Sequence, residues 1–299
     1  MADKNWRDEI KQRMNGYCEG CDVCNGVACA GRLPGMGGLG RALTFQNNFL
    51  SWEDLDVDIS GVRMPEIGTA PMTGAEENMG ACFSEKKFHL YIVKGAGEEG
   101  ILPCIGDGTP DFKLEFGAEA LRINGLKGAV FIKPYSNEEI INRYKRVEDA
   151  ACFAGLDIDS YNLKTMDGKA VLGKKTVSDL KYIKRKISVP FVVKGVALEE
   201  DVVMMEELEP DIVVVSNHGG RIRDNMEGIA CTLKKYSKRL KRICGELWVD
   251  GGLRKKDHLL KAAALGADRV LIGRPFIQGV SVFRDRGVKI VLERQFLLS

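Results

Sequence analysis

The chain has 299 residues, of which 44% are hydrophobic and 29% are charged, and this composition is ordinary for a globular protein. Its net charge of +2, from 44 basic and 42 acidic residues, gives no reason to expect nucleic acid or an anionic membrane surface as a partner. No apolar run approaches the roughly 18 to 20 residues that cross a bilayer, and the charged start MADKNWRDEI lacks the apolar region of a secretory signal. We therefore expect a cytoplasmic protein, with a length that suits one barrel domain.

Residues 1–66 differ from the rest of the chain and are interpreted as an N-terminal extension packed on the main domain. Four of the nine cysteines crowd into one segment of this extension: Cys18, Cys21, Cys24 and Cys29. A glycine-rich stretch, GMGGLG, follows at Gly35–Gly40. In a chain without a secretory signal, closely spaced cysteines are better interpreted as thiols or metal ligands than as disulfides.

The cysteine spacing, Cys-x2-Cys-x2-Cys-x4-Cys, leaves three alternatives open. The first three cysteines resemble the ligand run of ferredoxin-type iron–sulfur clusters, although the final gap is one residue longer and no proline follows Cys29. Four thiolates can also hold one tetrahedral Zn²⁺. The third alternative is a thiol-rich loop without metal, because short cysteine motifs also occur by chance.

From about residue 67 onward, short apolar runs alternate with longer segments of helical spacing. Eight runs are predicted to be strands: Ile67–Met72, Ile101–Ile105, Ala129–Tyr135, Cys152–Ile158, Phe191–Val196, Ile212–Ser216, Leu247–Asp250 and Val270–Ile272. Eight buried parallel strands that alternate with helices indicate the α/β class and a closed (β/α)8 barrel, predicted here over residues 67–299. One helix is predicted to start at Ser136, and another over Lys256–Leu265 to stop before Gly266.

The last two predicted strands end in the features of a phosphate site. Active sites of such barrels lie at the C-terminal ends of the strands, and the loops after strands seven and eight often bind phosphate. Gly251, Gly252 and Gly273 allow backbone N–H groups to approach an anion. Arg254 and Arg274 add charge-assisted donors. We therefore predict an anion site here, rather than glycines that only turn the chain.

Strands five and six end in residues suited to acid–base chemistry and to anion binding. His218 lies between a polar strand end and two glycines, and the ordinary histidine pKa of about 6.5 suits proton transfer at neutral pH. Arg221 can bind a carboxylate through two parallel hydrogen bonds. Lys194 ends an apolar strand at the barrel mouth, where an ammonium group needs an anionic partner. These neighbours favour a catalytic histidine over a structural one.

Four motifs near these strand ends belong together: Ser216–Arg221 (SNHGGR), Asp250–Arg254 (DGGLR), Gly266–Asp268 (GAD) and Ile272–Pro275 (IGRP). In combination they closely resemble the FMN-dependent α-hydroxy acid oxidase and dehydrogenase family, which includes glycolate oxidase and lactate oxidase. The resemblance is strong from about Val189 to Phe276 and can be traced back to Ala70–Thr73 (APMT). It implies an FMN-binding (β/α)8 barrel.

The resemblance also implies a reaction, the oxidation of a small L-2-hydroxy acid to the 2-oxo acid with a hydride equivalent passing to the flavin. The resemblance implies that His218 is the base, that Asp159 holds it, and that Arg221 binds the substrate carboxylate. Tyr135 contacts the substrate, and Lys194 lies at flavin N1 and O2, where negative charge develops on reduction. The implied cofactor-binding residues are Ala70, Pro71, Met72, Lys133, Lys194, Ser216, Asp250, Gly251, Gly252, Arg254, Gly273 and Arg274.

The chain departs from the family pattern at several positions. Lys133 stands where the family usually has glutamine near the flavin, and Asp157 stands where it has threonine. Gly106–Gly108 follows the second strand, where the family has a tryptophan, and Lys164 is the only candidate for the second substrate arginine. These departures leave the substrate side chain open.

Two other functions remain as alternatives. Type 2 isopentenyl diphosphate isomerase uses FMN without net redox change, and Met72–Gly74 resembles one of its motifs, but the sequence has no His-x-Asn-x-x-Gln stretch. The altered third and fourth strands suggest a non-catalytic flavin-binding or electron-transfer protein, whereas His218 and Arg221 argue against it. The sequence does not specify the electron acceptor, and the tetramers usual in the family make a homo-oligomer one alternative for the assembly.

Overall fold

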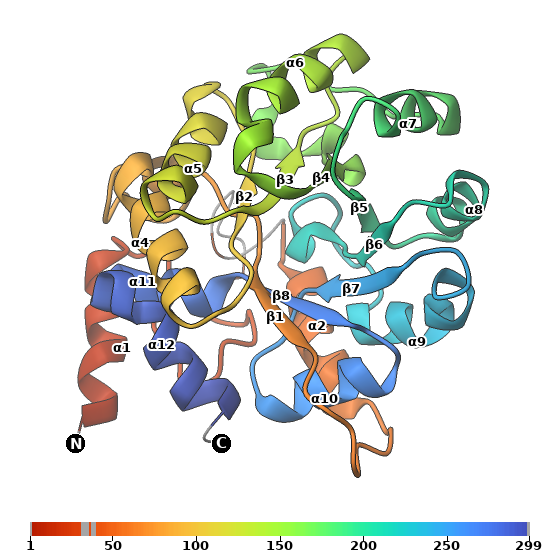
Figure 1. Ribbon diagram of the computed structural model, residues 1–299. Helices are drawn as coiled ribbons and strands as arrows, with labels where there is room; N and C mark the ends of the chain where they lie inside the picture. The colour runs from red at the N-terminus through yellow and green to blue at the C-terminus, as the bar shows by residue number, and fades with distance from the viewer. Residues whose placement is uncertain (1, 31–35, 37–39, 298–299) are drawn as a thin grey trace.

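The computed structural model describes residues 2–30, 36 and 40–297. Eight parallel strands form one sheet: β1 (Glu66–Thr69), β2 (Cys104–Gly106), β3 (Gly128–Ile132), β4 (Ala151–Asp157), β5 (Phe191–Val196), β6 (Ile212–Val215), β7 (Glu246–Asp250) and β8 (Arg269–Ile272). Their order in the sheet is β1-β8-β7-β6-β5-β4-β3-β2. Parallel bridges from Gly68 to Leu102 and from Met72 to Ile105 bring β1 beside β2 and nearly close the ring (Figure 1). The predicted (β/α)8 barrel and its eight strands are confirmed.

Helices alternate with the strands and surround them (Figure 1). They are α3 (Ala75–Asn78), α4 (Glu85–Glu98), α5 (Phe112–Ile123), α6 (Asn137–Val147), α7 (Val177–Lys184), α8 (Glu199–Leu208), α9 (Ile229–Leu240), α10 (Lys256–Ala264), α11 (Arg274–Phe283) and α12 (Gly287–Val291). The hydroxyl of Ser136 caps α6 by accepting from the N–H of Glu139 at 3.2 Å. The two helices predicted from their end signals, α6 and α10, are confirmed. No helix in the described ranges is long and apolar enough to cross a membrane.

The barrel interior explains why polar side chains gather at one end. A small inner core fills the barrel: Cys104, Ala129, Phe131, Val192, Ile212, Val214, Trp248 and Leu271. Successive residues of a strand point to opposite faces, so the residue two positions beyond an inward side chain also points inward. Lys194 lies two residues beyond Val192, and Asp250 lies two residues beyond Trp248. Both polar side chains therefore reach the open end of the barrel.

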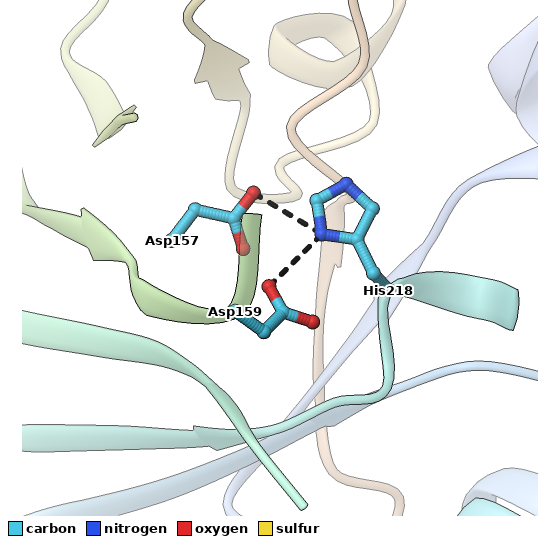
Figure 2. A group of neighbouring side chains, drawn as sticks. All are labelled: Asp157, Asp159 and His218. Carbon is cyan, nitrogen blue, oxygen red and sulfur yellow. Dashed lines mark hydrogen bonds and ion pairs between the residues drawn. The ribbon is translucent and has the colours of Figure 1, made fainter. Parts of the chain in front are cut away.

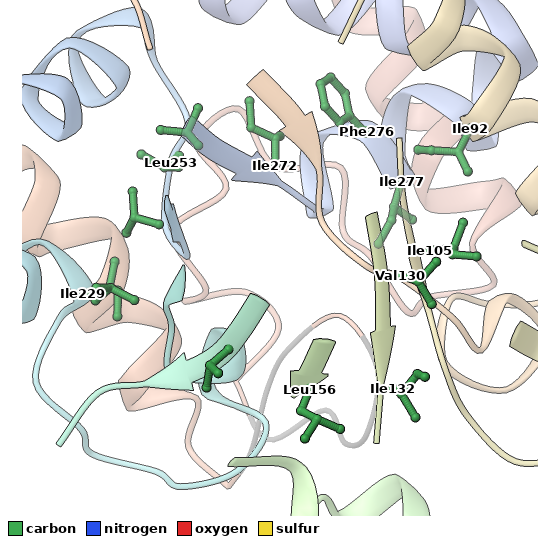
Figure 3. Close-up of a cluster of buried hydrophobic side chains, with 14 of the residues drawn as sticks. Ile92, Ile105, Val130, Ile132, Leu156, Ile229, Leu253, Ile272, Phe276 and Ile277 are labelled. Carbon is green, nitrogen blue, oxygen red and sulfur yellow. The ribbon is translucent and has the colours of Figure 1, made fainter. Parts of the chain in front are cut away.

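A larger apolar layer lies between the strands and the helices. Figure 3 shows part of it, with Ile132 on β3, Leu156 on β4 and Phe276 on α11 among the buried side chains. Burial of apolar surface on this scale is the main driving force for folding. It holds the strands in place and so fixes the positions of the residues at their ends.

The chain before β1 packs onto the barrel through two helices, α1 (Ala2–Arg13) against α11 and α2 (Leu43–Asp54) against α9. The side chains of Asn48 and Asn217 exchange hydrogen bonds of 2.8 and 2.7 Å, and Trp52 Nε1 donates to the carbonyl of Gly251 at 2.8 Å. The extension therefore contacts the loops after β6 and β7 directly. The boundary near residue 66 stays a prediction, and most of the stretch Gly35–Gly40 lies outside the described residues.

Candidate active site

A cavity of about 1140 Å³, measured to its open mouth, lies at the C-terminal ends of the strands. Most of the predicted site residues line it: Ala70, Pro71, Met72, Lys133, Lys194, His218, Arg221, Asp250, Gly251, Gly252, Arg254, Gly273 and Arg274. This is the end of the barrel at which enzymes of this fold bind their ligands.

His218 lies in the loop after β6 and has a left-handed backbone, with φ 56°. This conformation is unusual for a residue other than glycine and often marks a functional position. The ring Nδ1 lies 3.1 Å from Asp159 Oδ1 and 3.4 Å from Asp157 Oδ2 (Figure 2). Because ionised carboxylates only accept hydrogen bonds, Nδ1 donates, and Nε2 on the other side of the ring is the nitrogen that can take up a proton.

The two carboxylates beside His218 have opposite pKa shifts. Burial raises the pKa of Asp157, but the positive charges of His218, Lys133 and Lys194 outweigh burial and hold the pKa well below its usual value. The pKa of Asp159 is instead raised. Burial and the negative charge of Asp157 raise it, and His218 opposes them only in part. Asp157 is therefore the ionised partner at every pH near neutrality, and it stabilises a protonated His218.

Two buried lysines complete this network. Lys133 Nζ lies 2.6 Å from Asp157 Oδ2, and Lys194 Nζ lies 3.2 Å from Asp157 Oδ1 and 3.3 Å from Asp250 Oδ2. Lys194 also donates to Ser216 Oγ at 3.1 Å. Burial lowers the pKa of Lys194, but the negative charges of Asp157 and Asp250 raise it by more than burial lowers it. The net shift is therefore upward. Lys194 thus has the anionic partners that its position requires. Ser216 does not line the cavity itself but accepts a hydrogen bond from Lys194.

Arg274 begins α11 and is buried at the phosphate end of the cavity. Its guanidinium donates to two backbone carbonyl groups at 2.8 Å and lies 3.7 Å from the centre of the Phe45 ring. Burial, together with the positive charges of Arg221 and Arg254, holds the pKa of Arg274 well below its usual value. Three neighbouring guanidinium groups repel one another, and a bound anion relieves this repulsion.

Two buried polar atoms at this end have no hydrogen-bond partner among the described residues, namely the Nη2 donor of Arg254 and the Oδ1 acceptor of Asp250. The other nitrogens of Arg254 donate to the carbonyls of Cys24 at 3.1 Å and Leu253 at 2.7 Å. Unpartnered buried polar atoms are rare and indicate a missing ligand. A mononucleotide offers phosphate oxygens that accept and hydroxyl groups that donate, so the residues present fit FMN.

Arg221 lines the same cavity as His218. Burial lowers its pKa, while Asp250 and Asp157 act in the opposite direction. In the part of the chain that the structure describes, no carboxylate forms an ion pair with Arg221. Its fork of donors is therefore available to an anionic ligand that shares the cavity with His218.

Two residues expected near the substrate lie elsewhere. Tyr135 does not line the cavity; its ring lies 4.1 Å from the guanidinium of Arg143, and burial raises its pKa to about 12. Lys164, the candidate second carboxylate ligand, is exposed and pairs with Asp167 at 3.4 Å. The substrate contact of Tyr135 stays a prediction, and the position of Lys164 gives it no support.

Other polar residues line the cavity without having been predicted. Asp107, after β2, accepts a hydrogen bond of 2.9 Å from Arg143 and is almost fully buried. Lys113, on α5, pairs with Glu77 at 2.9 Å. The signal for Asp107 was present, because a polar residue directly follows a predicted strand. Lys113 and Glu77 lie in helical segments whose spacing does not distinguish a cavity wall from solvent.

The fold and this cavity define a class of protein: a (β/α)8 barrel whose arginine-lined end, after β7 and β8, suits a phosphorylated cofactor. A family model described as FMN-dependent dehydrogenase matches residues 132–295, which is more than half of the chain. The chain therefore belongs to the FMN-dependent dehydrogenase family, and the resemblance stated from the motifs is confirmed.

Curated relatives agree with this family. A 2-hydroxyacid oxidase of Dictyostelium discoideum is 39% identical over 221 residues, which cover 70% of this chain and 50% of the relative. The cytochrome-type L-lactate dehydrogenase of Saccharomyces cerevisiae is 38% identical over 122 residues, 40% of this chain and 21% of the relative. The chain thus spans half or less of the length of these relatives. None of them favours the isomerase alternative.

Solved structures show the same fold. A mandelate oxidase variant crystallised with 2-hydroxy-phenylacetamide superposes with a TM-score of 0.73 over 97% of this chain and 89% of that chain, at 20% sequence identity. Another mandelate oxidase variant, which holds a monooxide FMN adduct, superposes with a TM-score of 0.67 over 86% of this chain and 85% of that chain, at 21% identity. At this level of identity, the likeness establishes the barrel fold.

Proposed function

We propose that this protein uses FMN to oxidise a small L-2-hydroxy acid to the 2-oxo acid. The observation that carries the proposal is the arrangement of His218 and Arg221 in one cavity. His218 Nδ1 contacts two carboxylates, at 3.1 and 3.4 Å, which leaves Nε2 as the base. Arg221 lacks a carboxylate partner among the described residues and suits the carboxylate of such a substrate.

The cofactor is held from the wall of the cavity. Arg254 and Arg274, with the backbone of Gly252 and Gly273, would hold the phosphate, and Lys194 would supply positive charge to the flavin. When bound, FMN supplies the acceptor for the hydride equivalent that leaves the substrate. We expect the cofactor released from the purified protein to be FMN, because Arg254 and Arg274 form one anion site after β7 and β8, which suits a single phosphate. Release of FAD contradicts this assignment.

The residues of the chain perform four tasks. Arg221 binds and orients the substrate carboxylate, which places the substrate hydroxyl and C2 near His218. His218 takes a proton from the substrate at Nε2. Asp157 and Asp159 then hold the resulting imidazolium through Nδ1 and stabilise its charge. Lys194 provides positive charge where the reduced cofactor accumulates negative charge.

Anaerobic titration of the flavin-loaded protein tests the proposal. We expect L-lactate or glycolate to bleach the flavin absorbance, with D-lactate as the matched control that leaves it unchanged. A prenyl diphosphate is the corresponding test of the isomerase alternative. Conversion of the prenyl diphosphate, or failure of a panel of L-2-hydroxy acids to reduce the flavin, contradicts the proposed oxidation. The homo-oligomer and the cytoplasmic location stay predictions.

A further inference from the structure

The cysteine segment, defined here as residues 18–29, lies against the arginine-lined end of the cavity. Cys18 is buried, and its Sγ accepts a hydrogen bond of 3.1 Å from Gln278 on α11. The carbonyl of Cys24 accepts from Arg254 Nε at 3.1 Å. Arg7 on α1 donates to the carbonyl of Cys21. The segment is therefore packed between the N-terminal helix and the rim of the proposed cofactor site.

Two glycines give the cysteine segment a specific shape. Gly20 has φ 62°, and a Cβ atom there would lie 2.2 Å from the carbonyl oxygen of Arg7. Gly26 has φ 87°, and a Cβ atom there would lie 2.0 Å from the Phe45 ring. Only glycine fits both positions. The conformation is thus set by close backbone contacts, and it holds four thiols on one short loop.

The four thiols are free to act as ligands. All nine cysteines are free thiols, so none of the four is held in a disulfide. They lie within one twelve-residue segment whose path is fixed by the contacts of Gly20 and Gly26.

We propose that Cys18, Cys21, Cys24 and Cys29 bind an iron–sulfur cluster. This proposal does not depend on the oxidation proposed above. Four closely spaced cysteines are the usual ligand set of such clusters, and the first three have the spacing of a ferredoxin run.

The cysteine spacing favours a cluster over a single zinc ion. Structural zinc sites usually take their ligands as two separated pairs. Three cysteines in one Cys-x2-Cys-x2-Cys run are instead typical of an iron–sulfur cluster.

The charges around the segment also suit a cluster. An iron–sulfur cluster with four thiolate ligands is anionic, and Arg254 and Arg274 lie beside it. Neither arginine forms an ion pair with a carboxylate in the portion of the chain described here. A neighbouring anionic centre stabilises both guanidinium groups.

Anaerobic purification of the flavin-loaded full chain tests the proposal. We expect iron and acid-labile sulfide in equal amounts, about four atoms of each per chain. Cys24→Ser should lose most of both, while its flavin content and circular dichroism stay close to wild type. Cys231→Ser is the matched control, because Cys231 is exposed on α9, away from the segment, and should keep both.

A second measurement on the wild-type protein covers the case in which Cys24→Ser does not fold. Alkylation of the native protein, followed by mass spectrometry, should find the four thiols of the segment protected, and an iron chelator should expose them. Zinc at one ion per chain, with no sulfide, overturns the cluster. Full alkylation of the four thiols in a metal-free native protein overturns any metal site. Bleaching of the flavin by L-lactate bears on the oxidation alone, so the two proposals fail separately.

Discussion

The ion pair between Lys133 and Asp157 offers a sharp test of the site, because both residues depart from the family pattern. Lys133 is 7% exposed and Asp157 is 3% exposed, and Lys133 Nζ lies 2.6 Å from Asp157 Oδ2. We expect Asp157→Thr to destabilise the protein strongly, because it leaves the Lys133 ammonium buried without its counter-ion. Adding Lys133→Gln to the same chain should restore much of the loss.

The magnitude follows from the geometry. At an effective dielectric constant of about 20, a separation of 2.6 Å corresponds to roughly 6 kcal/mol of Coulomb energy. Desolvation of both ions offsets most of this gain, so the intact pair adds little net stability, whereas removing one partner costs about 3–5 kcal/mol. Lys194 keeps Asp250 at 3.3 Å, which leaves Lys133 as the unpaired group. Since Lys133 faces the cavity and can reach water there, we expect the lower end, about 3 kcal/mol.

Urea unfolding at pH 7 with saturating FMN measures the effect in four proteins: wild type, each single variant and the double variant. The free energies of unfolding should be non-additive by about 2 kcal/mol, with the double variant more stable than Asp157→Thr alone. Lys86→Gln is the control, because Lys86 pairs with Glu119 at 2.7 Å on the surface, and its loss should cost less than about 1 kcal/mol. Additive changes, or a loss below about 1 kcal/mol in Asp157→Thr, refute the argument.

Three further predictions concern the same cavity. His218→Ala should keep its flavin but lose about 10²- to 10⁴-fold in the rate of flavin reduction, measured by anaerobic stopped flow; reduction at the wild-type rate shows that another group is the base. Arg221→Lys should raise KM for the hydroxy acid by about tenfold, because a point charge cannot replace the two parallel hydrogen bonds, while the exposed Lys164→Ala leaves KM unchanged. The lowered pKa of Asp157 means that its ionised form stabilises the fold above the ordinary aspartate pKa of about 4 and that this contribution is lost as the pH falls through the lower folded value. The free energy of unfolding, measured in urea, should therefore fall less steeply below about pH 4 in Asp157→Thr than in wild type, and an equal fall in both proteins contradicts this role.

The barrel and the gathering of polar residues at one rim were predictable from sequence for a physical reason. Buried parallel strands are short apolar runs with β-branched residues, and their C-terminal ends meet at one rim. Residues directly after such runs, including Lys194, His218 and Arg254, were therefore expected to share a site, and the cavity brings them together. The register of the strands did not need to be known for this step.

Contacts between neighbouring side chains were harder to predict, because they depend on local packing. Tyr135 follows β3 like the site residues, but it packs against Arg143 instead of lining the cavity. Asp107 Oδ1 accepts a hydrogen bond of 2.9 Å from the same arginine. No periodic pattern connects Tyr135, Arg143 and Asp107, since they come from three separate segments. Only the packed structure shows that Arg143 holds them together.

The Lys133–Asp157 pair shows the same limit in its clearest form, because it depends on an irregularity in the sheet. At the start of the two strands, Gly128 is opposite Ala151, but the next residue, Ala129, is opposite Phe153, so β4 contains one extra residue there. The shifted register continues to the strand ends and places Asp157 beside Lys133. Without the extra residue, Lys133 would be opposite Leu156, and Asp157 would point away from it. Considered separately, Lys133 and Asp157 each replace a residue that the family has near the flavin. In the observed register, Lys133 and Asp157 form an ion pair, and Asp157 also lies beside His218.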